Sequence, residues 1–197
     1  MKRILVAYTT NTGSTEEVAR AVAEELGKAG DQVETRRIEE VSDISTYQAV
    51  VVGAPMILGW HRAALRFVKK NRQVLSRVPV AYFFTAMRLT ATGETSINGV
   101  PVCVDPKLAA PPQKTGRLSF KERYATVKNY LSPALRAAPE VKPVSAAFFG
   151  GKLEMFRLKL PQMLFVMAII RAQPGDFRNF SFIREWASGL RSQWTRA

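Results

Sequence analysis

TTNTGST, residues 9–15, follows directly on the apolar run ILVAY at residues 4–8. A short continuous apolar run predicts a buried strand. A hydroxyl-rich segment with one glycine that then opens a helix is typical of a phosphate-binding loop. Unpaired N–H groups at the helix start and the loop hydroxyl groups can both donate hydrogen bonds to a phosphate oxygen. The stretch therefore predicts a strand, a phosphate loop and a helix, in that order.

The loop contains no lysine, and the chain has neither the P-loop pattern of NTPases nor the G-x-G-x-x-G pattern of dinucleotide folds. Neutral donors and a helix dipole suit a tightly held, non-reacting monophosphate, which points towards FMN. The pattern TxTGxT at residues 10–15, preceded by Tyr8, resembles the phosphate-loop signature of the flavodoxin family, with Ala7 as a mild departure from it. The alternative is an ordinary polar turn that caps a helix. We expect the phosphate contacts to come from Thr10, Asn11, Thr12, Gly13, Ser14 and Thr15.

Strand and helix patterns alternate along the chain. Apolar runs predict strands at residues 3–8, 47–54, 80–85 and 144–149, and the charged stretch 32–38 predicts a weaker strand of the kind found at a sheet edge. Helical periodicity predicts helices at 14–29, 62–76, 121–130 and 181–194. Ser14 and Glu17 have the spacing of a capping box, and Pro133 is expected to end a helix or start a short second piece. This alternation predicts an α/β fold: a flavodoxin-like, doubly wound, five-stranded parallel sheet of order 2-1-3-4-5 with helices on both faces. We expect a single domain over residues 1–197, with insertions at about 86–120 and 152–176.

Composition limits the classes of function. The 197 residues are 47% hydrophobic, enough for one core, and the single cysteine, Cys103, excludes an intramolecular disulfide and a cysteine-cluster metal site. The net charge is +13: residues 1–100 hold 13 basic and 10 acidic side chains, and residues 101–197 hold 16 and 6. The second half therefore carries most of the surface that would meet an anionic partner. The N-terminal apolar run is too short for a signal peptide, and the longest uncharged apolar run, 163–170, is too short to span a bilayer. These features predict a cytoplasmic protein that is soluble or peripheral to the inner face of the cell membrane.

Two further loops are expected beside the cofactor. In open α/β sheets ligands lie beyond the carboxyl ends of the strands. The resemblance to flavodoxins places the loops after the third and fourth strands against the flavin ring, and Trp60 offers a flat face for stacking. His61 and Arg88 are weak catalytic candidates; the alternatives are a helix-start residue and a solvated loop cation. The expected ring contacts are Pro55, Met56, Ile57, Leu58, Gly59, Trp60, Thr85, Ala86, Met87, Arg88 and Leu89.

Residues 152–171 combine cations with a segment that is apolar on nearly every side. Such a segment is buried in protein, in a partner or in the membrane interface. Together with the frame G-A-x4-G at 53–59 and the run RFVKK at 66–70, it is similar to bacterial flavodoxin-like, quinone-linked protoporphyrinogen oxidases. That resemblance implies electron transfer from a porphyrinogen to a membrane quinone such as menaquinone. We expect the contacts to an apolar anionic substrate or an anionic membrane to involve Arg157, Lys159 and Arg171.

Three functions compete. The leading hypothesis is a peripheral-membrane, FMN-dependent oxidoreductase with a quinone or another electron acceptor. The second is an electron-carrier flavodoxin whose basic face docks an acidic redox protein. The third, nucleic-acid binding, ranks last because no nucleic-acid-binding motif accompanies the charge. The sequence does not determine the substrate, the electron acceptor, the redox potential or the oligomeric state. It also does not determine whether the 86–120 insertion is ordered without a ligand.

Overall fold

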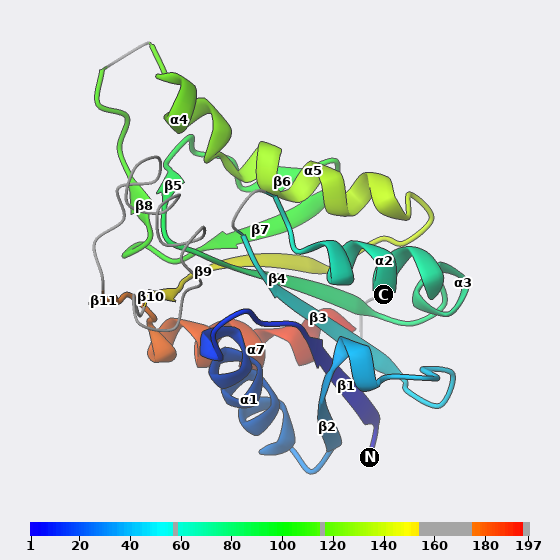
Figure 1. Ribbon diagram of the computed structural model, residues 1–197. Coiled ribbons are helices and arrows are strands. Elements are labelled where there is room, and N and C mark those ends of the chain that lie inside the picture. Colours follow the sequence, from blue (N-terminus) through cyan, green and yellow to red (C-terminus); the bar gives the residue numbers. More distant parts are fainter. Residues whose placement is uncertain (57–58, 115–116, 154–174, 195–197) are drawn as a thin grey trace.

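The computed structural model describes residues 1–56, 59–114, 117–153 and 175–194. Its main feature is a twisted sheet with helices on both faces (Figure 1). Five central strands are mutually parallel, and a sixth continues the sheet in parallel beside the fifth. The last strand pairs antiparallel at the edge. The spatial order is β2 (Gln32–Arg37), β1 (Arg3–Tyr8), β3 (Ala49–Pro55), β4 (Val80–Ala86), β9 (Ser145–Gly150), β7 (Val100–Val104) and β6 (Ser96–Ile97).

Alternate residues of the central strands enter two separate cores. On β4, Tyr82 and Phe84 pack into one core with α2 (Arg62–Lys70) and α5 (Val127–Ala137). Phe83 points to the opposite face, where α1 (Ser14–Gly27) and α7 (Phe180–Trp194) lie. Strands buried on both faces read as continuous apolar runs, which is why β1, β3 and β4 stand out in the sequence. The doubly wound arrangement is thus confirmed, with α1 and α7 below the sheet in Figure 1 and α2 and α5 above it.

The expected order 2-1-3-4-5 is present as β2-β1-β3-β4-β9, but the expectation of five strands was wrong, because β7 and β6 extend the sheet beyond β9. Both extra strands come from the stretch between β4 and α4 (Phe120–Tyr124), which we call the first insertion, residues 87–119. Val102, Cys103 and Val104 pair with residues 146–148 of β9. A second short pair joins β5 (Leu89–Thr90) to β8 (Ala109–Ala110). The described part of the first insertion therefore contains four short strands, β5 to β8.

Several helix boundaries also differ from expectation: the helix expected at 121–130 is divided into α4 and α5, because Thr126 caps the start of a separate helix. The helix expected at 62–76 is divided into α2 and α3 (Arg72–Leu75), and the Asn71 side chain donates to the Phe67 carbonyl at the break. Pro133 does not end a helix: α5 continues through it to Ala137. Burial of one face of α5, including Tyr130, Leu131 and Ala134, offsets the hydrogen bond that proline cannot make. A short 3₁₀ helix, η1 (Ile38–Glu40), follows β2.

Candidate functional site

The carboxyl ends of the parallel strands meet along one edge of the sheet. Tyr8 at the end of β1 lies beside Gly53 of β3, and Ala86 at the end of β4 lies beside Gly150 of β9. Hydrogen bonds continue this register past the strands: Thr9 donates to the Gly53 carbonyl at 3.1 Å. The segments that follow β1, β3, β4 and β9 therefore all begin at the same edge, where open α/β sheets bind ligands.

Gly53 brings β3 and β4 together at this edge. A Cβ atom placed on Gly53 would lie 1.8 Å from the Phe83 ring, so no larger residue fits without moving that ring. The glycine in the predicted G-A-x4-G frame is therefore required for core packing. This packing keeps the ends of β3 and β4 in line with each other.

The predicted phosphate loop joins β1 to α1. Gly13 has φ of 92°, a left-handed conformation that favours glycine, and it is the N-cap of α1 with no side chain capping the helix. The expected capping box of Ser14 and Glu17 was therefore wrong, because the Glu17 carboxylate instead forms an ion pair with Arg178. The Thr10 hydroxyl accepts a hydrogen bond from the Gly13 N–H at 3.0 Å and shapes the loop. A helix start without a side-chain cap fits a phosphate, which can accept from the first N–H groups.

The loop hydroxyls have different surroundings. Thr15 is fully buried, and its hydroxyl lies 3.0 Å from that of Thr85 at the end of β4. Asn11 is exposed, whereas Thr10, Thr12 and Ser14 are half-buried. Thr15 thus ties the helix start to the neighbouring strand end, and the residues before it face outward. The sequence pattern identified both threonines but did not show that they touch.

The loop after β3 is partly described. Met56 and Trp60 form an isolated antiparallel bridge, and Gly59 between them has φ of 105°, which again favours glycine. Ile57 and Leu58 lie outside the described residues. Trp60 is 2% exposed, and its ring packs 5.2 Å from Tyr82 and 4.9 Å from Phe84 between centroids. The described contacts of the Trp60 ring are therefore with core residues of β4, and they anchor the loop after β3 to the core.

The loop after β4 mixes buried and half-buried residues. Thr85, Ala86 and Leu89 are buried, whereas Met87 and Arg88, like Pro55 across the edge, are half-buried. The Arg88 carbonyl accepts a hydrogen bond from the Tyr130 hydroxyl at 3.3 Å. This bond ties the loop after β4 to α5 close to Met87 and Arg88.

His61 is the N-cap of α2. Its Nδ1 accepts a hydrogen bond from the Ala63 N–H at 3.3 Å, and burial lowers the pKa of the imidazole. An acceptor Nδ1 and a lowered pKa both favour the neutral ring at pH 7. The geometry therefore gives His61 a capping role, which agrees with the simpler of its two interpretations.

The predicted substrate or membrane segment is described only at its two ends. Arg157, Lys159 and Arg171 lie outside the described residues. The chain leaves through β10 (Lys152–Leu153) and returns through β11 (Gly175–Asp176), and these two strands pair antiparallel. The Gly151 N–H donates to the Ala86 carbonyl at 2.9 Å, which places this entry point beside the loop after β4. Both ends of the segment are therefore rooted at the carboxyl edge.

Arg178 is a residue that sequence reasoning missed. Its side chain is 4% exposed and lies 2.9 Å from the Glu17 carboxylate in the first turn of α1. It also makes a two-pronged contact with Asp176, at 2.8 Å through Nε and 2.6 Å through Nη2. The phosphate loop itself carries no cation, so Arg178 brings positive charge close to the start of α1. Because Glu17 and Arg178 are far apart in the sequence, no local pattern could have paired them.

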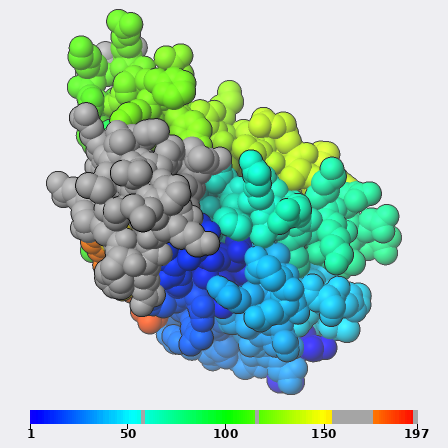
Figure 2. All heavy atoms as spheres, viewed as in Figure 1, coloured from blue at the N-terminus to red at the C-terminus, as the bar shows by residue number. Residues whose placement is uncertain are grey.

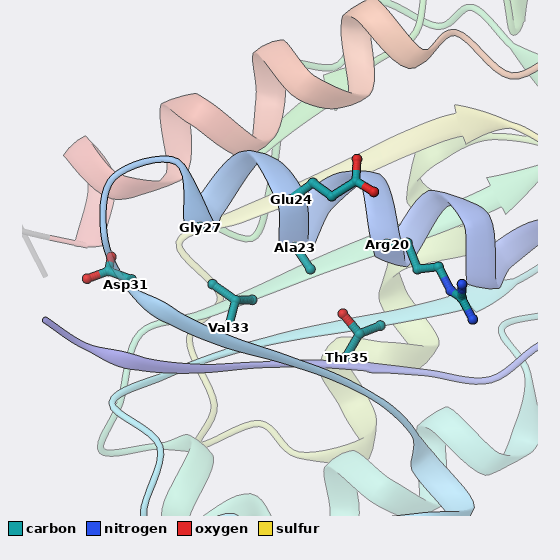
Figure 3. Close-up of a pocket in the computed structure, with 7 residues that line it drawn as sticks. All are labelled: Arg20, Ala23, Glu24, Gly27, Asp31, Val33 and Thr35. Atoms are coloured by element: carbon teal, nitrogen blue, oxygen red, sulfur yellow. The ribbon is translucent and has the colours of Figure 1, made fainter.

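A pocket of about 320 Å³ lies elsewhere, between α1 and the edge strand β2 (Figure 3). It runs along α1 from Arg20 towards Asp31, away from Gly13 and the phosphate loop. This pocket is therefore not the expected cofactor site. Its lining consists of Arg20, Ala23, Glu24, Gly27, Asp31, Val33 and Thr35.

Comparison with known sequences decides the family. The family model for the flavodoxin domain matches residues 5–178. The chain belongs to the flavodoxin domain family. It is thus a flavodoxin-like redox flavoprotein, and its cofactor is FMN. The uncapped helix start after Gly13 fits the phosphate of that cofactor.

Among curated proteins, this flavodoxin-domain chain is 31% identical to the protoporphyrinogen IX dehydrogenase [quinone] of Escherichia coli (strain K12) over 84 residues. The match covers 41% of this chain and 46% of that protein, so the chain spans about half the length of its curated relative. Similarity of this extent supports an oxidoreductase.

Among solved structures, a short-chain flavodoxin associated with a non-canonical PDU bacterial microcompartment is 14% identical. It covers 98% of both chains with a TM-score of 0.52. The flavodiiron protein from Giardia intestinalis is 11% identical, covers 100% of this chain and 37% of that chain, and has a TM-score of 0.51. At these identities the likeness shows the fold, and it agrees with the family assignment.

Within residues 1–56, 59–114, 117–153 and 175–194, no helix has the length and apolarity needed to cross a bilayer. The same ranges contain no cluster of three or more His, Cys, Asp or Glu side chains that could hold a metal ion.

Proposed function

We propose that this chain is an FMN-dependent oxidoreductase, peripheral to the inner face of the cell membrane, that passes electrons from an apolar anionic, porphyrinogen-like substrate to a quinone. The observation that carries the proposal is the uncapped start of α1, at the edge where β1, β3 and β4 end. The partial match to a quinone-linked dehydrogenase supports the substrate class and the acceptor. The net charge of +13 supports an anionic partner.

The phosphate end of the cofactor would be held by neutral groups. In this proposal Thr10, Asn11, Thr12, Gly13 and Ser14 surround the phosphate, and the fully buried Thr15 fixes the loop against Thr85 from behind. The helix dipole and backbone N–H groups supply the attraction. Binding at this end therefore orients the cofactor along the carboxyl edge.

The ring end would lie between the loops after β3 and β4. Residues 55–60 and 85–89 would contact the ring. Among them, the half-buried Met87 would offer a polarisable sulfur and the half-buried Arg88 a positive charge. When bound, FMN supplies the ability to accept and release two electrons. The protein has to bind this group, exclude water from it and hold the substrate beside it. Arg157, Lys159 and Arg171 are proposed to meet the substrate or the membrane.

The test is spectroscopic. Purified protein is supplemented with FMN, reduced anaerobically and mixed with a menaquinone analogue while the flavin absorbance is followed. We expect the oxidised spectrum to return within seconds and porphyrinogens to serve as reductants. A Thr12→Val variant, in which a loop hydroxyl is removed, should weaken FMN binding, whereas a Thr46→Val variant on a distant exposed loop should not.

An electron carrier is the second candidate, favoured by the excess of basic side chains in residues 101–197. A carrier would bind FMN, ignore quinone and form salt-sensitive complexes with acidic redox proteins. Bound flavin that fails to react with quinone would move the assignment to this function. Absence of FMN binding at any concentration would contradict both.

A further inference from the structure

One surface, formed by the end of the first insertion, α4 and the start of α5, is rich in exposed basic and aromatic side chains that have no part in the proposed redox site. We call residues 111–114 and 117–129 the tip. The tip includes α4 and projects from the body of the molecule at the top of Figures 1 and 2. Thr90 holds it in place: the Thr90 N–H donates to the Ala125 carbonyl at 2.7 Å, and its hydroxyl donates to the Glu122 carbonyl at 3.0 Å. Since β5 begins three residues after β4 ends, the tip is mounted at the carboxyl edge.

The exposed charges of the tip are all positive. Its one acidic residue, Glu122, is 2% exposed, and its two carboxylate oxygens accept from the N–H groups of Gln113 at 2.6 Å and Ser119 at 2.8 Å. The carboxylate is therefore directed at the backbone of the tip and not at its surroundings. The cationic side chains are all exposed: Lys114, Arg117, Lys121, Arg123 and Lys128.

Aromatic side chains accompany these cations. Phe120 is 80% exposed and Tyr124 is 39% exposed, and they are among the few large apolar side chains that the described surface leaves open. The two residues are four positions apart on α4, which places them on the same side of the helix. Isolated exposed apolar residues are ordinary, but a pair flanked by cations marks an interaction surface.

We propose that the tip docks on an anionic lipid membrane, with Phe120 and Tyr124 entering the interface and the surrounding cations meeting the headgroups. Aromatic rings favour the boundary between headgroups and acyl chains, and basic side chains are attracted to the negative surface potential. A nucleic acid would satisfy the charges, but exposed apolar area beside them favours lipid. Docking through the tip would bring the carboxyl edge close to a bilayer, where a quinone dissolves. This inference rests on the membrane part of the proposed function.

The test uses the full chain and vesicles of defined composition. Wild-type protein should co-sediment with vesicles of phosphatidylglycerol and phosphatidylcholine, and much less with phosphatidylcholine alone. Replacing both rings, Phe120→Ser with Tyr124→Ser, should weaken binding about tenfold. Replacing two charges, Lys121→Gln with Arg123→Gln, should weaken it by a similar factor of about ten at low salt and by less at high salt.

Matched controls separate the tip from net charge and from the redox site. Lys69→Gln with Lys70→Gln removes two exposed cations from α2 and should leave vesicle binding close to wild type. All tip variants should keep FMN binding and reaction with a water-soluble quinone, because no tip residue belongs to the cofactor site.

Three outcomes would overturn the proposal. Unchanged vesicle binding by both tip variants, with binding lost on removal of residues 154–174, would place the membrane contact elsewhere. Failure of the wild type to bind any anionic vesicle would reject the tip and the membrane part of the function together, while the quinone reaction still tests the rest. Tighter binding to a DNA duplex than to vesicles, lost in the same variants, would make the tip a nucleic-acid surface.

Discussion

At the end of β1 the chain needs only residues 9–13 to reach α1, whereas at the end of β4 it runs through residues 87–119 before α4 begins. The short loop is shaped locally, by Thr10 accepting from Gly13 and by a left-handed glycine. The long insertion is shaped by distant partners, as β7 pairs with β9 and Asp105 accepts from Asn179 at 3.0 Å. Two connections at one sheet edge, separated by β3, are thus specified by interactions of very different range.

This difference separates the loop that we propose to hold the cofactor phosphate from the insertion beside it. The predicted phosphate loop can keep its shape through contacts within a few residues and through hydrogen bonds to the adjacent strands β3 and β4. The first insertion depends on the completed sheet, since the strand it pairs with, β9, comes later in the chain. The two regions should therefore respond differently to substitutions, and the following predictions are ordered from the largest effect to the smallest.

A substitution in β3, which lies between β1 and β4, should destabilise both regions. Gly53→Ala puts a Cβ atom into the Phe83 ring, and overpacking of this kind costs about 3 kcal/mol. We expect a matching fall in the free energy of unfolding by urea, together with weaker FMN binding. Gly189→Ala is the control: this glycine lies inside α7 with open space around it, so alanine should stabilise by about 0.5–1 kcal/mol. Equal stability of Gly53→Ala and wild type would contradict the packing described here.

The bond between Thr15 and Thr85 joins the two regions directly. Thr15→Val leaves the buried Thr85 hydroxyl without this partner and should cost about 1–3 kcal/mol of unfolding free energy. Thr15→Ser keeps the hydroxyl and should cost less. Adding Thr85→Val to Thr15→Val should recover part of the loss, because neither hydroxyl is then left unpaired. Strictly additive losses in this double-mutant cycle would show that the two side chains do not interact.

Arg178 should affect the phosphate end of the site alone. Arg178→Met leaves the Glu17 carboxylate uncompensated near the start of α1, where it would repel a phosphate. We expect FMN to bind about tenfold more weakly, with little change for riboflavin, which has no phosphate. Adding Glu17→Gln should restore FMN affinity towards wild type. Equal losses for both flavins in fluorescence titrations would mean that Arg178 acts only on the packing of the loop.

The smallest effect is confined to the first insertion and depends on pH. Hydrogen bonds from the Ser119 side chain and from the backbone of Gln113 and Ser119 lower the pKa of Glu122 to about 2 from its usual 4.5. Because the folded-state pKa is depressed, the stabilisation is present above pH 4.5 and is lost as the pH falls towards about 2. The protection of the amides of residues 113 and 119, measured relative to their intrinsic exchange rate at each pH, should therefore fall over this interval, while protection in β1 does not. In Glu122→Gln this fall in protection with falling pH should disappear.

Much of the sheet could be predicted because its central strands are buried on both faces. The boundaries of β1, β3, β4 and α7 differ from expectation by two residues or fewer. The extra strand β7 could not be predicted in this way, since Pro101 interrupts its apolar pattern and its partner is distant in sequence. The same limit applies to α5, where burial outweighs the proline.

The site shows a similar division. The stretch predicted to bind phosphate stands out in the sequence because hydroxyl groups, one glycine and a helix start follow one another within seven residues. The inward role of Thr15, the capping role of His61 and the core contacts of Trp60 depend on which face of a loop turns to the sheet. Arg178 depends on a return of the chain that no periodicity encodes. The sequence pattern thus indicated where the loops lie, and only the structure showed which side chains turn towards the sheet.

The paired strands β10 and β11 have a consequence for engineering. Leu153 and Gly175 face each other across the ladder, so the chain enters and leaves residues 154–174 through neighbouring positions. A two-residue Asn-Gly turn is suited to connecting antiparallel strands that lie this close. A chain in which this turn replaces residues 154–174 is therefore expected to keep the pairing of Leu153 with Gly175. Exchanging the segment between flavodoxin-domain proteins at the same two positions would ask whether the choice of electron partner changes with it.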